Sequence, residues 1–143
     1  MTTKQYLAQI RKLDMIIKNK LTEIVQYKDI VECKVPKNDD DKVQKSSDGD
    51  KVGRFVPEIV DREKEIKLMI AKKDRIIRQI ENMPENYMYE ILYLAFVDDL
   101  DMKEIERKLH YSKSKTYRLF NQSLAIFEER YGKTYLKKQQ KIS

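Results

Sequence analysis

Apolar residues recur along the first 32 positions with the spacing of an amphipathic helix. Many of them are three, four or seven residues apart, as expected for one face of a helix. The pattern predicts one long helix from Lys4 to about Glu32. Its apolar face is narrow, as in a coiled coil, so this helix needs a partner helix. The residues of this face are Tyr6, Ile10, Leu13, Ile17, Leu21, Ile24, Tyr27 and Val31.

A second amphipathic segment follows between Pro57 and about Asn82. Pro57 suits the first turn of a helix, and Pro84 disfavours helical geometry at the residue before it. Two helices of similar length predict a long antiparallel, coiled-coil-like hairpin over residues 1–83. Pairing of these helices between two chains is an open alternative, which would make a homodimer. The apolar positions of the second segment are Ile59, Ile66, Met69, Ile70, Ile76, Ile77, Ile80 and Met83.

The segment between the two helices is polar. It contains Pro36, the aspartates at 39–41 and the Ser, Asp and Gly residues at 46–50. Such a composition predicts a mobile connector over about residues 34–56. A calcium-binding loop is disfavoured, because aligning Gly49 with the loop's glycine would put Phe55 where the loop needs a glutamate.

Three further helices are predicted after Pro84. The first is a support helix from about Glu85 to Val97, and the second starts at Met102 and ends near Leu109. Asp101 and Glu104 have the spacing of a capping box for that second helix. Leu100 and Ile105 occupy the positions of a hydrophobic staple around it. Ser112 is a good N-cap for the third helix, which runs to about Tyr131.

The last two helices fit a helix-turn-helix template of about twenty residues. Two departures concern Glu106, where a small residue is usual, and His110, where the turn usually has glycine. A looser turn is therefore expected, and a plain helical hairpin is the alternative. The pattern predicts an all-α chain with a C-terminal helix-turn-helix segment over residues 84–143. The template's buried positions fall on Ile105, Leu109, Tyr111, Thr116 and Leu119.

The helix after Ser112 has polar and basic residues on its early turns and no acid before Glu128. Amide and guanidinium groups can form two hydrogen bonds to the edge of one base, whereas cations and a helix N-terminus bind phosphates. A solvated basic face is the alternative. Candidate base contacts are Ser114, Tyr117, Arg118, Asn121 and Gln122, and candidate phosphate contacts are Arg107, Lys108, Ser112, Lys113 and Lys115.

Charge is distributed unevenly over the 143 residues. The net charge is only +6, but residues 107–143 carry 10 basic and 2 acidic groups, including a basic tail from Lys133 to Lys141. Residues 84–106 carry 1 basic and 7 acidic groups. The cationic end favours a polyanionic partner, of which nucleic acid is the commonest.

Several function classes are disfavoured. A single cysteine, Cys33, and a single histidine, His110, leave no intrachain disulfide and no zinc site, and no cofactor is expected. Asp98, Asp99 and Asp101 could hold a metal ion, but helix-end and capping roles explain them, so an enzyme is not expected. No stretch approaches the roughly 18 apolar residues of a membrane span, and no signal peptide is visible. We expect a cytoplasmic protein with no membrane contact.

Two C-terminal segments, Tyr89 to Leu94 and Met102 to Leu119, resemble region four of bacterial sigma factors. Four earlier segments precede them in a fixed order: Tyr6 to Asp14, Asp41 to Gln44, Gly49 to Lys51 and Ile59 to Ile66. With these segments the whole chain is similar to the ArpU and RinA late-gene regulators of phages and prophages, although Thr116 stands where that group usually has a small aliphatic residue. The resemblance implies a late-gene activator that binds double-stranded promoter DNA in the host bacterial cell, with host RNA polymerase as a further candidate partner.

Two other functions stay open at the level of sequence. A phage DNA-packaging component of the small terminase type also joins a helix-turn-helix to assembly helices. A coiled-coil interaction protein without a DNA role would use only the apolar faces of the long helices. The number of subunits in the assembly distinguishes a packaging component from a regulator, because packaging subunits form large rings. Salt-dependent affinity for DNA distinguishes a regulator from an interaction protein, which would have none.

Overall fold

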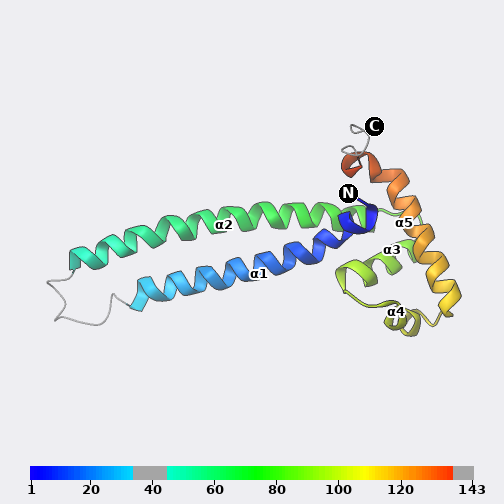
Figure 1. Cartoon of the computed structure of the whole chain (residues 1–143), viewed down its shortest axis with the longest axis horizontal. Helices are drawn as coiled ribbons and strands as arrows, with labels where there is room; N and C mark the ends of the chain where they lie inside the picture. The colour runs from blue at the N-terminus through cyan, green and yellow to red at the C-terminus, as the bar shows by residue number, and fades with distance from the viewer. Residues whose placement is uncertain (34–44, 137–143) are drawn as a thin grey trace. The chain divides into compact units, whose positions relative to one another are not determined.

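The computed structural model describes residues 1–33 and 45–136, and every regular element in these ranges is a helix (Figure 1). The prediction of an all-α chain is confirmed. None of the described helices is both long enough and apolar enough to cross a membrane. The connector residues 34–44, which include the segment Asp41 to Gln44, and residues 137–143 of the basic tail lie outside the described ranges. The elements are α1 (Thr3–Cys33), α2 (Lys45–Glu81), α3 (Asn86–Leu92), the π-helical η2 (Tyr93–Val97), α4 (Met102–Leu109) and α5 (Lys113–Tyr135).

Helix α2 begins earlier than the sequence suggested. Residues 45–56 were predicted to belong to the connector, and the structure corrects this, because they form the first turns of α2 and Pro57 lies inside the helix. A proline ring normally clashes with the carbonyl four residues before it, which here belongs to Gly53. Upstream of the proline, the Phe55 ring packs on Tyr27 of α1 with 5.2 Å between ring centroids. This long-range contact stabilises a segment that local composition describes as a loop.

The described chain divides into two compact units. Of the described residues, one unit contains 1–14 and 72–136, and the other contains 15–33 and 45–71. The first two helices therefore contribute to both units. Residue 83, where the sequence suggested a boundary, lies inside the first unit.

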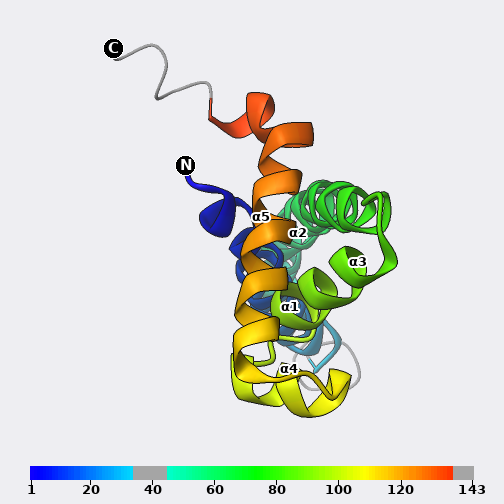
Figure 2. The same ribbon diagram turned by 90° about the vertical axis from the view of Figure 1, so that its right-hand side faces the viewer.

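The first unit has one apolar core to which all six elements contribute. The ends of α1 and α2, assigned from sequence to the hairpin, are buried together with side chains of α3, α4 and α5, whose arrangement Figure 2 shows. Burial of this many apolar side chains is the main force that holds the unit together. The buried members are Leu7, Ile10, Ile76, Ile80, Met83, Met88, Ile91, Leu92, Leu94, Ile105, Phe127 and Tyr135.

Aromatic and hydroxyl groups join the first turns of α1 to the last turns of α5. The Tyr6 ring stacks on Tyr135 with 4.2 Å between centroids, and the Tyr6 hydroxyl donates to Oε1 of Gln79 at 2.6 Å. The Thr3 hydroxyl lies 2.8 Å from the Tyr135 hydroxyl and 3.0 Å from Oε1 of Glu128. Burial raises the pKa of both tyrosines, because it disfavours the charged phenolate. These contacts hold α5 at its C-terminal end.

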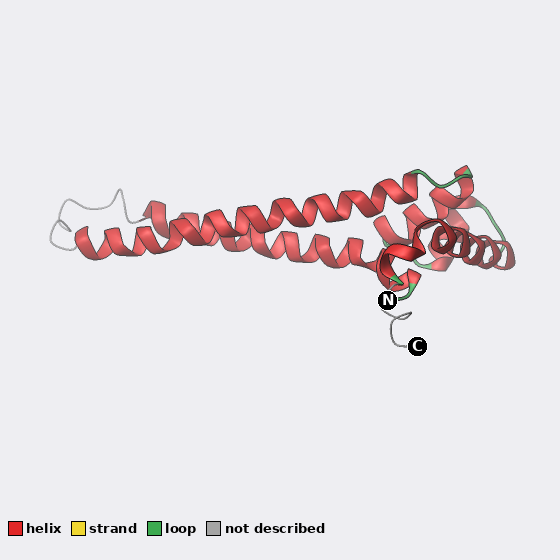
Figure 3. Cartoon of the chain, turned by 90° about the horizontal axis from the view of Figure 1, so that it is seen from above, coloured by secondary structure: helices red, strands yellow, loops and turns green. Residues whose placement is uncertain are grey.

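In the second unit α1 and α2 run side by side and antiparallel (Figure 3). Lys20 pairs with Glu65 at 3.1 Å and Glu23 pairs with Arg62 at 2.8 Å, so residue numbers rise along one helix as they fall along the other. The apolar contact between the helices is narrow, which agrees with the predicted narrow faces. Its members are Ile17, Ile24 and Ile66, with Ile59 and Met69 packed against them.

Candidate nucleic-acid interface

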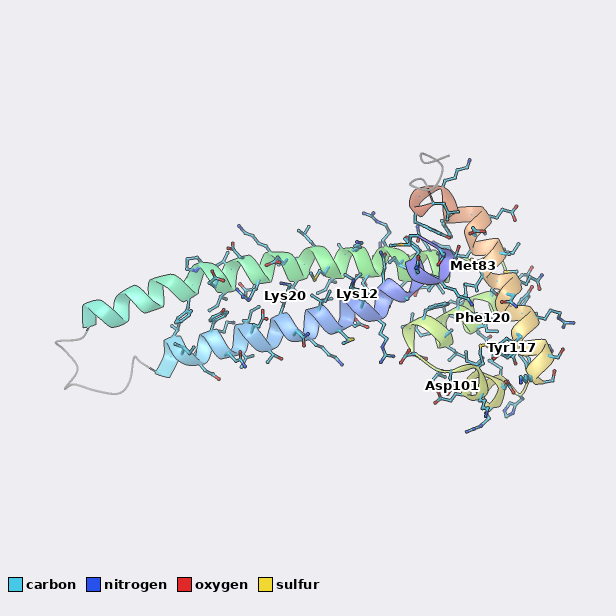
Figure 4. All side chains as sticks on the ribbon, in the orientation of Figure 1. Lys12, Lys20, Met83, Asp101, Tyr117 and Phe120 are labelled. Carbon is cyan, nitrogen blue, oxygen red and sulfur yellow. The ribbon has the colours of Figure 1, made fainter. Side chains whose placement is uncertain are left out.

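Helix α4 starts and ends where the sequence predicted. Oδ1 of Asp101 accepts from the Glu104 backbone N–H at 2.9 Å, and Oε1 of Glu104 accepts from the Asp101 N–H at 2.9 Å, which confirms the capping box. Figure 4 labels Asp101 at this helix start. Leu100, before the cap, packs against the core that contains the fully buried Ile105. Cap and staple together fix the direction in which the chain enters α4.

The turn between α4 and α5 has left-handed backbone geometry at His110. This residue has φ 59° and ψ 41°, a conformation that few residues other than glycine adopt, although asparagine, aspartate and histidine do so more often than the rest. The His110 N–H donates to the Glu106 carbonyl, and the Tyr111 N–H donates to the same oxygen at 3.1 Å. The second bond is the wide one of a Schellman cap. The turn therefore has the backbone form that glycine usually supplies in this motif.

Replacement of His110 by glycine should stabilise the protein by about 0.5–1 kcal/mol. Glycine removes the cost of the left-handed conformation, about 1–2 kcal/mol, and part of this gain is lost to its greater freedom in the unfolded chain. Urea denaturation of wild type, His110→Gly and His110→Ala measures the effect. We expect glycine to be the most stable and alanine to be no better than histidine. A less stable glycine variant would mean that the exposed imidazole makes a stabilising contact.

Helix α5 is capped as predicted and extends further than predicted. Oγ of Ser112 accepts from the Lys115 N–H at 3.1 Å, which confirms the N-cap. The fully buried Thr116 donates its hydroxyl to the Ser112 carbonyl at 2.8 Å, so threonine satisfies its polar group within the helix. Helix α5 continues to Tyr135 rather than ending near Tyr131, because the Tyr135 ring is 8% exposed and packs in the core.

Helix α4 lies beside the first turns of α5 (Figure 2). The side chains of Ile105 and Thr116 are both fully buried, one from each helix. Leu109 and Leu119 are half-buried and pack against the core that contains Ile105. Four of the five positions predicted to face inward thus do so. Tyr111 is half-buried but does not pack against this core.

Element η2 was predicted as the last turns of the support helix. Its backbone is instead π-helical, with the Asp98 N–H donating to the Tyr93 carbonyl at 3.0 Å. The Phe96 ring of η2 stacks on Phe120 of α5 with 6.0 Å between centroids. Asp99, which follows in left-handed geometry at φ 57°, pairs with Arg11 of α1. The ring contact thus joins η2 to α5, and the ion pair joins the residues after η2 to α1.

Four of the predicted base-contact residues share the outward face of α5. Ser114, Arg118, Asn121 and Gln122 are all exposed and follow one another at spacings of three, four or one residue. At 3.6 residues per turn such positions lie along one side of a helix. The sequence has no acidic residue from Ser112 to Phe127. This surface therefore presents the guanidinium group of Arg118 and the amide groups of Asn121 and Gln122, with no carboxylate among them.

Tyr117, the fifth predicted base contact, lies at the edge of this face. Its side chain is 43% exposed and lines a hollow together with Phe96, Phe120 and Asn121. Figure 4 labels Tyr117 and Phe120 on α5. Lys4 of α1 also lines the hollow, with its Nζ 5.8 Å from the centre of the Phe120 ring. Lys4 was not among the predicted site residues, because nothing local in the sequence relates a residue of α1 to α5.

The predicted phosphate contacts flank the turn. Arg107 and Lys108 end α4, while Ser112, Lys113 and Lys115 begin α5, and all five are exposed. Nζ of Lys115 lies 4.1 Å from the centre of the Tyr111 ring, so part of its surface is already in contact. Lys108 instead lines a separate hollow with Tyr89 and Tyr93, on the side of α3.

Among the described residues, the basic groups of α4 and α5 form no ion pairs. Within residues 1–33 and 45–136, ion pairs engage Arg11, Lys20, Arg62 and Lys73 but no basic group of α4 or α5. Basic groups without a partner carboxylate are available to a polyanion. The free cations are Lys103, Arg107, Lys108, Lys113, Lys115, Arg118, Arg130 and Lys133.

The acidic residues before α4 have structural contacts. Asp101 caps α4, and Asp99 pairs with Arg11. In the part of the chain that the structure describes, no group of three or more His, Cys, Asp or Glu side chains is placed to hold a metal ion. Compared with family models, curated proteins and solved structures, the chain matches none.

Proposed function

We propose that this protein is a sequence-specific regulator that binds duplex DNA with a helix-turn-helix formed by α4, the turn at His110 and α5. The observation that carries the proposal is the outward face of α5, where Arg118, Asn121 and Gln122 are exposed and no acid lies between Ser112 and Phe127. A carboxylate at this surface would repel phosphates, and its absence leaves the face open to DNA.

The chemistry of these side chains suits the major groove. Arginine donates two hydrogen bonds to O6 and N7 of guanine, and asparagine or glutamine pairs with N6 and N7 of adenine. A single exposed helix fits the width of this groove. Arg118, Asn121 and Gln122 therefore supply base contacts, and Ser114 supplies a fourth closer to the helix start.

Residues around the turn would hold the phosphates. The Ser112-capped start of α5 offers backbone N–H groups, and Lys113 and Arg107 offer charges on the two sides of the turn. Lys115 would reach a phosphate from its place over Tyr111. Such contacts set the register of α5 on the duplex without selecting its sequence.

The long helices complete the proposal. We assign α1 and α2 to an antiparallel hairpin supported by the pairs Lys20–Glu65 and Glu23–Arg62. The resemblance to phage late-gene regulators makes promoter DNA the target and host RNA polymerase a candidate partner of this hairpin.

The test is selection of duplexes from a random DNA pool by the full chain, followed by salt titration on a selected and a scrambled duplex. We expect one enriched motif and an affinity that falls with salt, with a slope of about 0.9 per phosphate contact. A pool without enrichment and an affinity insensitive to salt would refute DNA recognition. Ring assemblies of many subunits would instead favour the packaging function.

A further inference from the structure

The two sides of the helix pair in residues 15–71 differ in chemistry. One side is closed by the ion pairs Lys20–Glu65 and Glu23–Arg62, and Figure 4 labels Lys20 on α1. Leu21 follows Lys20 directly and lines a groove of about 450 Å³ between the helices, so the helical turn places it on the other flank of the contact.

Apolar side chains line this groove although they are exposed. Leu21 is 48% exposed and Val25 is 56% exposed, while Ile24 and Ile66 form the groove floor at 5% and 7%. The helix pair thus buries a narrow contact and leaves an adjoining apolar strip open. Two long helices held by so few buried side chains gain little from burial relative to the entropy of ordering them, so a further apolar layer would stabilise them.

Charges at the groove rim are complementary to each other. Lys28 of α1 and Lys67 of α2 line the groove together with Glu63, so both signs occur at one site. A surface that carries both signs can pair with itself across a two-fold axis, with each Glu63 facing a lysine of the other copy. A partner that carried only one sign of charge would place a like charge against either Glu63 or the two lysines.

We propose that a second copy of this chain occupies the groove, so that the two helix pairs form a four-helix interface. Leu21 and Val25 of each copy fill the groove of the other, and Glu63 pairs with a lysine across the interface. The inference is independent of the proposed DNA function, because every residue of the groove lies within residues 15–71 and α4 and α5 do not contribute to it.

Sedimentation equilibrium of the full chain tests this interface with a matched pair of variants. Leu21→Asp puts a carboxylate in the groove, whereas Leu68→Asp changes another leucine of the same helix pair that is 73% exposed and does not line the groove. We expect wild type and Leu68→Asp to be dimers and Leu21→Asp to dissociate at least about tenfold more readily. Circular dichroism should show that both variants keep their helix content.

Charge reversal supplies the second arm. Glu63→Lys alone should weaken the dimer, and combining it with Lys28→Glu and Lys67→Glu should restore the dimer, because all signs in the groove are then reversed together. A wild-type monomer at about 100 µM would overturn the proposal. A Leu21→Asp dimer as stable as wild type, or equal dissociation by Leu68→Asp, would overturn it as well. Binding of the selected DNA by a wild-type chain that is monomeric would leave the proposed function standing while the dimer proposal fails.

Discussion

Replacing Phe127 with alanine should destabilise the protein by about 3–5 kcal/mol. Phe127 is fully buried, and its ring centroid lies 6.0 Å from that of Tyr6 and 4.9 Å from that of Tyr131. The substitution removes apolar contacts and leaves a cavity between α1 and α5, which the stacked Tyr6 and Tyr135 rings cannot fill without breaking their hydrogen bonds. A loss of this size is a large share of the 5–15 kcal/mol that stabilises an ordinary domain.

Urea denaturation followed by circular dichroism measures this loss. Glu129→Ala is the matched control, because Glu129 lies on the same helix and is exposed. We expect the control to stay within about 0.5 kcal/mol of wild type. Phe127→Leu, which keeps most of the apolar volume, should fall between the two. A cost below about 1 kcal/mol for the alanine variant would contradict the packing of α5 against α1 around Phe127.

Arg118→Ala should reduce affinity for the selected DNA sequence by about 1–3 kcal/mol, or roughly 5- to 150-fold. The arginine is exposed at the middle of the outward face of α5 and forms no ion pair with the described acidic residues. Its loss removes a bidentate contact to one base, so the preference at that base should relax. Binding to scrambled DNA should fall only by the loss of one charge.

Lys113→Ala gives the contrasting result. Removal of a phosphate contact should weaken selected and scrambled duplexes alike and lower the salt slope by about one ion. Arg130→Ala removes the same charge from the later turns of α5 and should leave both affinity and preference near wild type. Fluorescence anisotropy titrations at several salt concentrations compare the three variants. Equal behaviour of Arg118→Ala and Arg130→Ala would exclude the start of α5 as the recognition element.

The helix starts near the C-terminus could be predicted because their causes are local. Asp101 and Ser112 each bond to a backbone N–H three residues later, so the spacing alone carries the information. The burial of Ile105 and Thr116 followed from helical periodicity for the same reason. The exposure of Arg118 follows from that periodicity too, because it lies opposite the buried positions.

The features that sequence did not predict depend on distant residues. Helix α2 begins before Pro57, where Phe55 meets Tyr27 of another helix, and no local pattern contains that contact. Tyr6 was assigned to a hairpin face, but its ring stacks on Tyr135 at the far end of the sequence. A periodic pattern predicts that a residue is buried, but it does not predict which residue it packs against.

The candidate site shows the same limit. Periodicity placed Tyr117 with the base contacts, yet its position beside Phe96 and Phe120 depends on the π-helical backbone of η2. The place of Lys115 over Tyr111 depends on the left-handed turn at His110. The residue types of α5 were thus enough to predict its outward face. The positions of Tyr117 and Lys115 at the edges of that face depend on the backbone geometry of η2 and of the turn.

The bond between Thr3 and Tyr135 has a consequence for synthesis on the ribosome. The two residues are separated by 132 positions, so Leu7 and Ile10 leave the ribosome long before the helix that covers them exists. Contacts of such long sequence separation form slowly and leave apolar surface exposed until they close. The nascent N-terminal helix therefore has to wait for α5, and the outward face of α5 gains its rigid support only after translation has passed Tyr135.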